Sequence, residues 1–205
     1  MGQAKLSQAE RTELSDARML DAAVQLIVEH GTVKTTLKDV GELAGYSRGL
    51  AGYRFGNKAG LYEFVVRSIG EKWLKALTKA TEGLTGYDAI EAAIDTHYCM
   101  CVKAPKDVRA FYTLWFGAIG PGSEVKQVIS NIHARRHQDV EQWVEQGIHQ
   151  GTIDPSVNAD AFAGQFGSAS IGIIYQWLIN PEDLNSTKRL YDNLKHTVQL
   201  WLMRP

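Results

Sequence analysis

Hydroxyl and cationic side chains gather in one short stretch of the sequence, between residues 36 and 58. Thr36 and Ser47 each stand just before a run with helical spacing, where the free N–H groups of a helix N-terminus attract anions. Arg48 follows Ser47 directly, and its guanidinium group can grip a phosphate or pair with the edge of a guanine. These residue types predict binding to a phosphate-bearing partner, and the choice between the two roles for Arg48 stays open.

Two short helices joined by a tight turn are predicted to position these side chains. Thr36 can cap the first helix, with Asp39 three residues on, as in a capping box. The apolar residues of 37–44 fall on one face, and Gly45 ends that helix. Ser47 is the predicted N-cap of the second helix. Such a helix-turn-helix offers the N-terminal end of its second helix to a DNA major groove.

The segment from Arg18 to Leu61 resembles the DNA-binding domain of the tetracycline-repressor (TetR) family of bacterial regulators. The resemblance covers roughly the first third of the chain and rests on an ordered set of residues with the family's spacing. These residues are Arg18, Leu20, Ala22, Ala23, Leu26, Gly31, Thr35, Thr36, Val40, Ala44, Gly45, Ser47, Gly49, Phe55, Lys58 and Leu61. The resemblance implies a three-helix DNA-binding domain, a homodimer and a ligand-binding second domain.

Two glycines depart from the family pattern. Gly52 stands where the family usually carries a Tyr, and Tyr53, next to it, can take over part of that role. Gly41 stands where the family prefers Ala, and a mid-helix Gly costs roughly 0.5–1 kcal/mol relative to Ala. Both positions lie inside the predicted helix-turn-helix.

Seven residues are the predicted DNA contacts. Four lie at or near the exposed N-terminal end of the second helix, while the hydroxyls and one lysine are better placed for phosphates. Simple capping is the alternative role for Thr36 and Ser47. The predicted DNA-binding residues are Thr36, Ser47, Arg48, Leu50, Ala51, Tyr53 and Lys58.

Charge is distributed unevenly along the chain. The 205 residues carry a formal net charge of −1, which by itself does not favour nucleic acid. Residues 32–60, however, hold five basic and two acidic side chains, a net charge of +3, and residues 61–205 have a net charge of −2. A local basic patch on a slightly acidic body fits a protein that binds double-stranded DNA with one end. Chance clustering of charge is the alternative.

The whole chain is predicted to be all-α, with about nine helices. Apolar residues recur at helical spacing throughout, and no alternation with a period of two appears. We expect a helix-turn-helix DNA-binding domain over residues 1–60 and a helical ligand-binding and dimerisation domain over residues 61–205. Residues before about 7 are expected to form a mobile arm.

Composition places the chain in a soluble class. No apolar run approaches the ~20 residues that a membrane span needs, and the N-terminus lacks the apolar core of a signal peptide. Cys99 and Cys101 are two residues apart in a helical pattern and point to different faces, so reduced thiols are expected. These features predict a cytoplasmic protein without a membrane partner.

The second domain carries the aromatic residues expected around a small molecule. Small-molecule sites are mostly apolar with a few converging polar groups, and an aromatic or amphipathic effector would suit this set. An ordinary aromatic core is the alternative for each residue. The predicted ligand-binding residues are His97, Tyr98, Cys101, Phe111, Tyr112, Trp115, Phe116, Phe166 and Tyr175.

Catalytic and metal chemistry find little support in the sequence. The pairs His133/His137 and His97/Cys101 are each four apart, but a metal needs a third and a fourth ligand. The segment 133–137 is interpreted as a solvated basic face. The chain has neither a Gly-x-Ser-x-Gly elbow nor a phosphate-binding glycine loop, so we predict no enzyme, no metal and no cofactor.

Self-association is predicted from two late helices. Small residues line the first of them (Gly164, Gly167, Ser168, Ser170 and Gly172), and an apolar seam marks the second (Leu190, Leu194, Val198 and Trp201). Two such helices from each of two subunits would form a four-helix interface, as is usual in the TetR family. The alternative is that these faces pack within one subunit.

The function predicted from the sequence is that of a ligand-responsive transcriptional regulator, a repressor that a small molecule releases from its operator. The resemblance implies that the helix following the DNA-binding domain transmits the effect. The alternative function is a ligand-binding or scaffold protein with a decayed helix-turn-helix, and activation in place of repression is also open.

Overall fold

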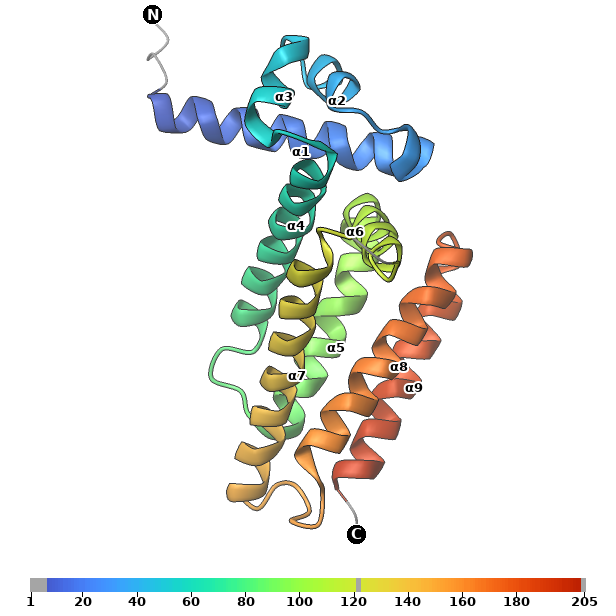
Figure 1. Ribbon diagram of the computed structural model, residues 1–205. Coiled ribbons are helices and arrows are strands. Elements are labelled where there is room, and N and C mark those ends of the chain that lie inside the picture. Colours follow the sequence, from blue (N-terminus) through green and yellow to red (C-terminus); the bar gives the residue numbers. More distant parts are fainter. Residues whose placement is uncertain (1–6, 121–122, 204–205) are drawn as a thin grey trace, which may run out of the picture. The chain divides into compact units, whose positions relative to one another are not determined.

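The computed structural model of the chain describes residues 7–120 and 123–203, with the side chain of Arg48 outside the description. Every regular element within these ranges is a helix, and nine are present, which confirms the all-α prediction (Figure 1). None of the nine combines the length and apolar content that crossing a membrane requires. The helices are α1 (Gln8–Lys34), α2 (Leu37–Leu43), α3 (Arg48–Phe55), α4 (Lys58–Ala80), α5 (Gly86–Lys103), α6 (Pro105–Gly117), α7 (Lys126–His149), α8 (Ala159–Ile179) and α9 (Leu184–Leu202).

Side-chain caps set several of these boundaries. The Ser7 hydroxyl accepts from the Glu10 N–H at 3.2 Å while the Glu10 carboxylate accepts from the Ser7 N–H at 2.7 Å, a complete capping box that starts α1 early, as predicted. Asn158 caps α8 by accepting from the Ala161 N–H at 2.9 Å. The arm expected before residue 7 lies outside the described residues.

Contacts group the chain into two compact units. Unit 1 contains residues 1–69 and 106–129, and unit 2 contains residues 70–105 and 130–205. Helix α4 contributes its first half to unit 1 and its second half to unit 2, and α6 belongs almost entirely to unit 1. This grouping describes contacts only, and the division of function at residue 60 stays a prediction.

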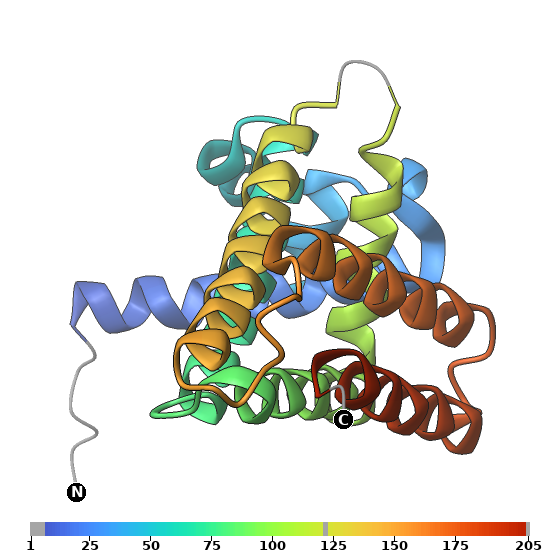
Figure 2. The ribbon, with the colours of Figure 1, turned by 90° about the horizontal axis from the view of Figure 1, so that it is seen from below.

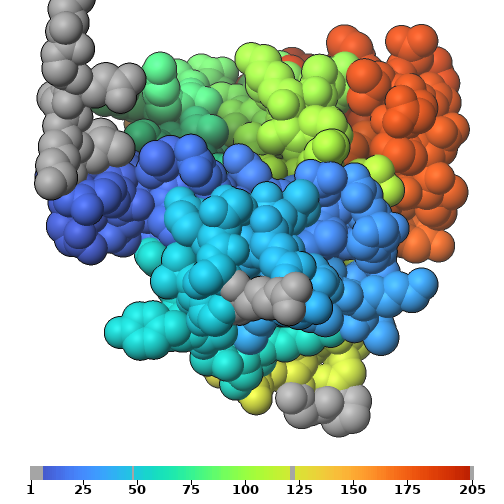
Figure 3. Space-filling view, turned by 90° about the horizontal axis from the view of Figure 1, so that it is seen from above, coloured from blue at the N-terminus to red at the C-terminus, as the bar shows by residue number. Residues whose placement is uncertain are grey.

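Unit 1 is built on the apolar faces of α1 and α4. Met19, Ala23 and Ile27 of α1 and Leu61 and Val65 of α4 are almost completely buried, at intervals of four residues that keep them on one side of each helix. Because burying a Met, Ile, Leu or Val side chain stabilises a fold by about 1.5–3 kcal/mol, these faces supply much of the stability of the unit. Helices α1, α2 and α3 occupy the face of the unit seen in Figure 3.

Unit 2 has a core made by α5, α7, α8 and α9. Ile90 and Ile94 of α5 pack in one cluster with Val144 of α7, Phe162 of α8 and Val198 of α9. Figures 1 and 2 show α8 and α9 running beside each other, with α5 next to α9. The core therefore joins elements that are more than 100 residues apart in the sequence.

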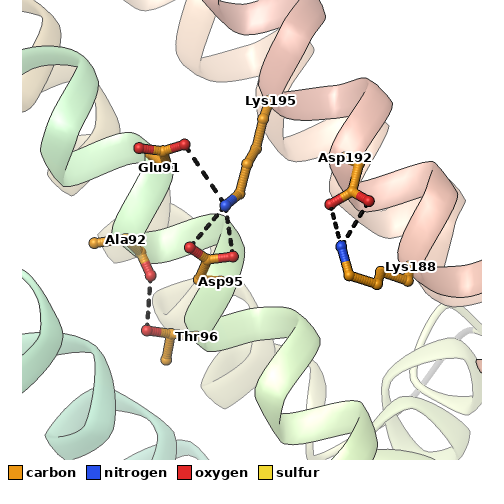
Figure 4. Close-up of polar contacts among 7 residues, drawn as sticks. All are labelled: Glu91, Ala92, Asp95, Thr96, Lys188, Asp192 and Lys195. Carbon is orange, nitrogen blue, oxygen red and sulfur yellow. Dashed lines mark hydrogen bonds and ion pairs between the residues drawn. The ribbon is translucent and has the colours of Figure 1, made fainter.

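A polar contact supports the α5–α9 packing. The Lys195 ammonium of α9 lies 2.7 Å from Asp95 and 3.6 Å from Glu91, both on α5 (Figure 4). Partial burial lowers the pKa of Lys195, but hydrogen bonding and attraction to the two carboxylates outweigh it, so the pKa is raised overall. The lysine therefore keeps its charge throughout the physiological range.

The structure corrects the expected seam on α9. Leu194 and Val198 are buried in the core of unit 2, and Leu190 packs against this core. This part of the predicted seam therefore packs within one subunit. The apolar side chains of α9 that remain exposed include Leu200 and Trp201. Sequence spacing finds an apolar face, but it does not tell which neighbour covers it.

Candidate nucleic-acid interface and candidate effector site

Helix α3 presents one face to solvent and buries the other. Tyr53 is 89% exposed, whereas Ala51 is completely buried and therefore offers no side chain to a DNA partner. Leu50 is half-buried. Arg48 begins α3, and its side chain lies outside the described residues. Among the predicted contacts on this helix whose side chains are described, Tyr53 is thus the one that projects freely.

The two predicted capping residues behave differently. Thr36 caps α2, because its hydroxyl accepts from the Asp39 N–H at 3.2 Å and donates to the Asp39 carboxylate at 2.6 Å. In a full capping box the Asp39 carboxylate would accept from the backbone N–H of Thr36. Here it accepts from the Thr36 hydroxyl instead. Ser47 occupies the N-cap of α3, but its side chain makes no capping hydrogen bond and is exposed. Its hydroxyl is accordingly available to a phosphate.

Lys58 links the start of α4 to the end of α1. Its ammonium donates to the Val33 carbonyl at 2.7 Å and lies 5.9 Å from the centre of the Tyr62 ring. Tyr62 donates to the neighbouring Thr32 carbonyl, and partial burial raises the pKa of its phenol to about 12. Lys58 holds the segment in place and also adds positive charge beside the helix-turn-helix.

Two further contacts fix the ends of the helix-turn-helix. Arg54 of α3 forms an ion pair with Asp16 of α1, so much of its charge is neutralised within unit 1. Asn57 caps α4 by accepting from the Gly60 N–H at 2.8 Å. The ion pair attaches α3 to α1, and the Asp16 partner was not apparent from the sequence because it is distant from Arg54 along the chain.

The predicted ligand-binding residues fall into both units. Phe111, Tyr112, Trp115 and Phe116 lie on α6 in unit 1, where neighbouring rings are 5.2–6.2 Å apart between centres. Three of these four are almost completely buried, and Phe116 is half-buried. They form a continuous aromatic cluster along one short helix.

The other predicted residues belong to unit 2. His97 and Cys101 of α5 are buried and meet the hydroxyl of Tyr191 on α9, at 2.9 Å from His97 Nδ1 and 3.8 Å from Cys101 Sγ. The Tyr98 ring lies 5.7 Å from the ring of the same tyrosine. Tyr191 was missing from the predicted set, since it is 94 residues from His97 and no local pattern joins them.

Phe166 and Tyr175, both on α8, have different surroundings. The Phe166 ring stacks against that of Phe162 with centres 6.2 Å apart, at the edge of the unit 2 core. Tyr175 is 58% exposed. Tyr175 therefore lies on the surface and not in a buried pocket.

Trp73 and Arg136 extend the cluster around His97. The Trp73 ring lies 5.3 Å from that of His97, and the Arg136 guanidinium carbon lies 3.2 Å from the centre of the Trp73 ring. Arg136 is half-buried, and the neighbouring His137 bonds to Asp160 at 2.9 Å, so the segment 133–137 is only partly the solvated face that we expected. A guanidinium stacked on an indole is a favourable cation–π contact.

Two polar groups of this cluster, His97 and Cys101, are neutral at physiological pH. Burial, with a smaller contribution from the Arg136 charge, lowers the pKa of His97 to about 3, so the imidazole is neutral at physiological pH. Burial raises the pKa of Cys101 to about 11, which keeps the thiol protonated and weakly nucleophilic. Neutral hydrogen-bonding groups among aromatic rings suit binding of a largely apolar molecule better than catalysis.

A surface hollow and the grouping of potential metal ligands in the described residues add no residue to the predicted ligand-binding set. A shallow surface hollow of about 630 Å³ runs along the second half of α4, lined by Leu74, Thr78 and their neighbours, and holds none of the predicted ligand-binding residues. Within the described ranges, no three His, Cys, Asp or Glu side chains are grouped as metal ligands would be.

Comparison with protein families places the first part of the chain. Residues 19–65 match the model of the bacterial regulatory proteins of the tetR family. The HTH-type transcriptional regulator TtgR of Pseudomonas putida is 36% identical over 62 residues, which are 30% of this chain and 30% of TtgR. The chain thus matches under a third of this relative's length. These matches confirm the resemblance stated from the sequence.

Solved structures share the fold over nearly the whole chain. SmeT, the repressor of the multidrug efflux pump SmeDEF of Stenotrophomonas maltophilia, superposes with a TM-score of 0.75 at 18% identity, over 92% of this chain and 91% of SmeT. A TetR-family regulator from Cytophaga hutchinsonii gives 0.79 at 13% identity, over 98% of this chain and 100% of the other. At these identities the comparison establishes a common fold.

The buried histidine predicts how unfolding depends on pH. Because the folded-state pKa of His97 lies below that of an unfolded histidine, about 6.5, the unfolded chain takes up the proton first. The contribution of the neutral His97 to the free energy of unfolding is therefore complete above pH ~6.5. It falls by ~1.4 kcal/mol per pH unit toward pH ~3. We expect urea unfolding at pH ~5 to show about 2 kcal/mol less stability from this source than at pH ~7.5.

The variant His97→Gln should lose much less stability between these two pH values, at equal protein concentration. His196→Gln, at an exposed position of α9, is the matched control and should behave like the wild type. An equal loss in the wild type and in His97→Gln would contradict this account of the cluster.

Proposed function

Because residues 19–65 make this chain a member of the TetR family of bacterial regulators, we propose that it is a transcriptional repressor that a small molecule releases from its operator. The observation that carries the proposal is the family match over a helix-turn-helix whose second helix projects an 89% exposed tyrosine. Residues 1–60 would bind DNA, and residues 61–205 would bind the effector and dimerise.

The proposed DNA contacts follow from the geometry of α2 and α3. Tyr53 would reach the DNA from the outward face of α3, and the unused hydroxyl of Ser47 would bind a phosphate at its N-terminus. Arg48 is assigned from the sequence alone, and Thr36 and Lys58 would contribute at the edge of the surface while keeping their contacts within unit 1. A cytoplasmic location accompanies this function.

A homodimer is proposed from the exposed face of α8. Ala161, Gly164, Ser168, Gly172, Tyr175 and Ile179 follow one another at intervals of three and four residues and are all exposed. This face carries no charge, and Ile179 is 68% exposed, which is unusual for an isolated soluble helix. A second copy would cover it, together with Leu200 and Trp201 of α9. Such a dimer would hold two α3 helices about 34–36 Å apart, or a multiple of that.

The effector is proposed to bind in unit 2, near His97, Tyr98 and Cys101. This cluster offers neutral hydrogen-bonding groups and aromatic surface, which suit an aromatic or amphipathic molecule. SmeT, which shares the fold, has been solved in complex with triclosan, an observation that concerns SmeT and supports the proposal by analogy only. Phe166 would border the site, and the α6 cluster is a second place where an aromatic molecule can bind.

Helix α4 is proposed to couple effector binding to DNA binding. It runs without interruption from Lys58 to Ala80, and it carries Leu61 in the core of unit 1 and Trp73 beside His97 in unit 2. A ligand that displaces Trp73 would therefore act on the helix that follows α3. Coupling of ~1–3 kcal/mol between two sites is typical and gives about 5–150-fold regulation.

Binding of DNA at two salt concentrations tests the proposal. A duplex would first be enriched from a random pool by the wild-type chain, and its affinity compared at low and at physiological salt. If six or more phosphates are contacted, the affinity should fall roughly 10³-fold between about 50 and 200 mM salt. We expect Tyr53→Ala to weaken binding about tenfold, equal to ~1.4 kcal/mol.

Tyr53→Phe separates the hydroxyl from the ring, and Leu84→Ala, at an exposed position of unit 2, is the control that should bind as the wild type. Weak, equal binding to the enriched duplex and to scrambled DNA would support the alternative of a ligand-binding or scaffold protein with a decayed helix-turn-helix.

A charge on the α8 face tests the dimer. Gly172→Arg should fold normally, because a Cβ at this position meets nothing within 4 Å. Placing an unpaired charge in an apolar interface should weaken the dimer by about 100-fold or more. Analytical ultracentrifugation measures this directly. Gly117→Arg, at an equally open position of α6, is the control and should stay dimeric. A Gly172→Arg variant that dimerises like the wild type would contradict the assignment of this face.

A further inference from the structure

Most glycines of the helix-turn-helix segment have a reason within the fold. Three adopt positive φ, which disfavours other residues, and at two others a side chain would meet a neighbouring carbonyl oxygen, in a clash at Gly60 and in a tight contact at Gly41. An ideal Cβ at Gly60 would lie 2.2 Å from the Phe55 carbonyl oxygen, and one at Gly41 would lie 3.2 Å from the Ser47 carbonyl oxygen. The three with positive φ are Gly31, Gly45 and Gly56.

Gly49 and Gly52 have no such reason. Both lie inside α3 without positive φ, and a Cβ at either position meets nothing within 4 Å. A glycine inside a helix costs about 0.8–1.0 kcal/mol relative to alanine. In a helix of only eight residues this is a considerable loss, and nothing in the described part of the folded chain compensates for it.

The two glycines lie next to Tyr53 on the surface of α3, where Gly49 is exposed and Gly52 is half-buried. Gly49 is three positions before Gly52 and four before Tyr53, so it lies beside both on the helix surface. Tyr53 therefore projects from a patch of bare backbone. An 89% exposed aromatic ring is a second, independent sign that this face meets a partner.

We propose that Gly49 and Gly52 are specificity-determining residues, which let double-stranded DNA approach the α3 backbone more closely than a Cβ would allow. The inference rests on the proposed DNA-binding function and adds how the surface of α3 contacts the DNA. With the backbone against the base edges, the Tyr53 ring lies deeper in the groove than it would above larger neighbours. Gly52, which replaces the usual tyrosine of the family, then serves DNA recognition and does not indicate a decayed helix-turn-helix.

Single alanine substitutions separate this role from a structural one. Gly49→Ala and Gly52→Ala should raise the thermal unfolding midpoint, because alanine favours a helix and has room here. The same variants should bind the duplex enriched by the wild-type chain at least tenfold more weakly. Gly117→Ala, at an open helical position of α6 far from α3 in the sequence, should leave affinity unchanged.

The two readouts have opposite signs, which a purely structural role would not produce. Gly52→Ser provides a second, slightly larger polar side chain and should weaken binding at least as much as Gly52→Ala. If the alanine variants bind within twofold of the wild type, the inference is wrong although the chain binds DNA. If the wild type enriches no sequence and shows no salt-sensitive binding, the proposed function itself fails, and this inference with it.

Discussion

The close contact between α2 and α3 determines which residues of this chain can reach DNA. Gly41 of α2 lies so near α3 that a Cβ there would be 3.2 Å from the Ser47 carbonyl oxygen and 3.5 Å from the Ala51 Cβ. The backbone also closes the turn, since the Gly41 carbonyl accepts from the Tyr46 N–H at 2.9 Å. Because Ala51 is buried at this contact, Tyr53 and Gly49, which lie on the opposite side of α3, face outward, and Gly52 lies beside them half-buried.

Further contacts of unit 1 hold α2, α3 and α4 in this arrangement. Thr36 and Asp39 fix the start of α2, and Arg54 attaches the end of α3 to Asp16 of α1. Lys58 then joins α4 to the end of α1. A helix of eight residues with two inner glycines would hardly form by itself, so its shape depends on these neighbours. Pre-organisation of this kind lowers the entropic cost of binding a rigid partner such as duplex DNA.

Features determined by neighbouring residues could be predicted from the sequence. Helix caps and turns depend on residues within three or four positions, and the sequence therefore predicted the caps at Ser7, Thr36 and Asn158 and the turn at Gly45. Contacts between distant segments could not be predicted. Tyr191 meets His97, and Arg136 covers Trp73, only because the core of unit 2 brings α4, α5, α7 and α9 together. For the same reason the apolar seam of α9 was assigned to a partner, although Leu190, Leu194 and Val198 pack within their own subunit.

Site-specific photo-crosslinking tests the central claim, that the outward face of α3 lies against DNA, most directly. A photoreactive phenylalanine derivative would replace Tyr53 in one variant and Leu84 in another, and each would be irradiated with the enriched duplex. The account predicts crosslinks at position 53, mapped to the centre of each half-site, and none at position 84. Binding to the duplex without any crosslink at position 53, or equal crosslinking from both positions, would contradict it.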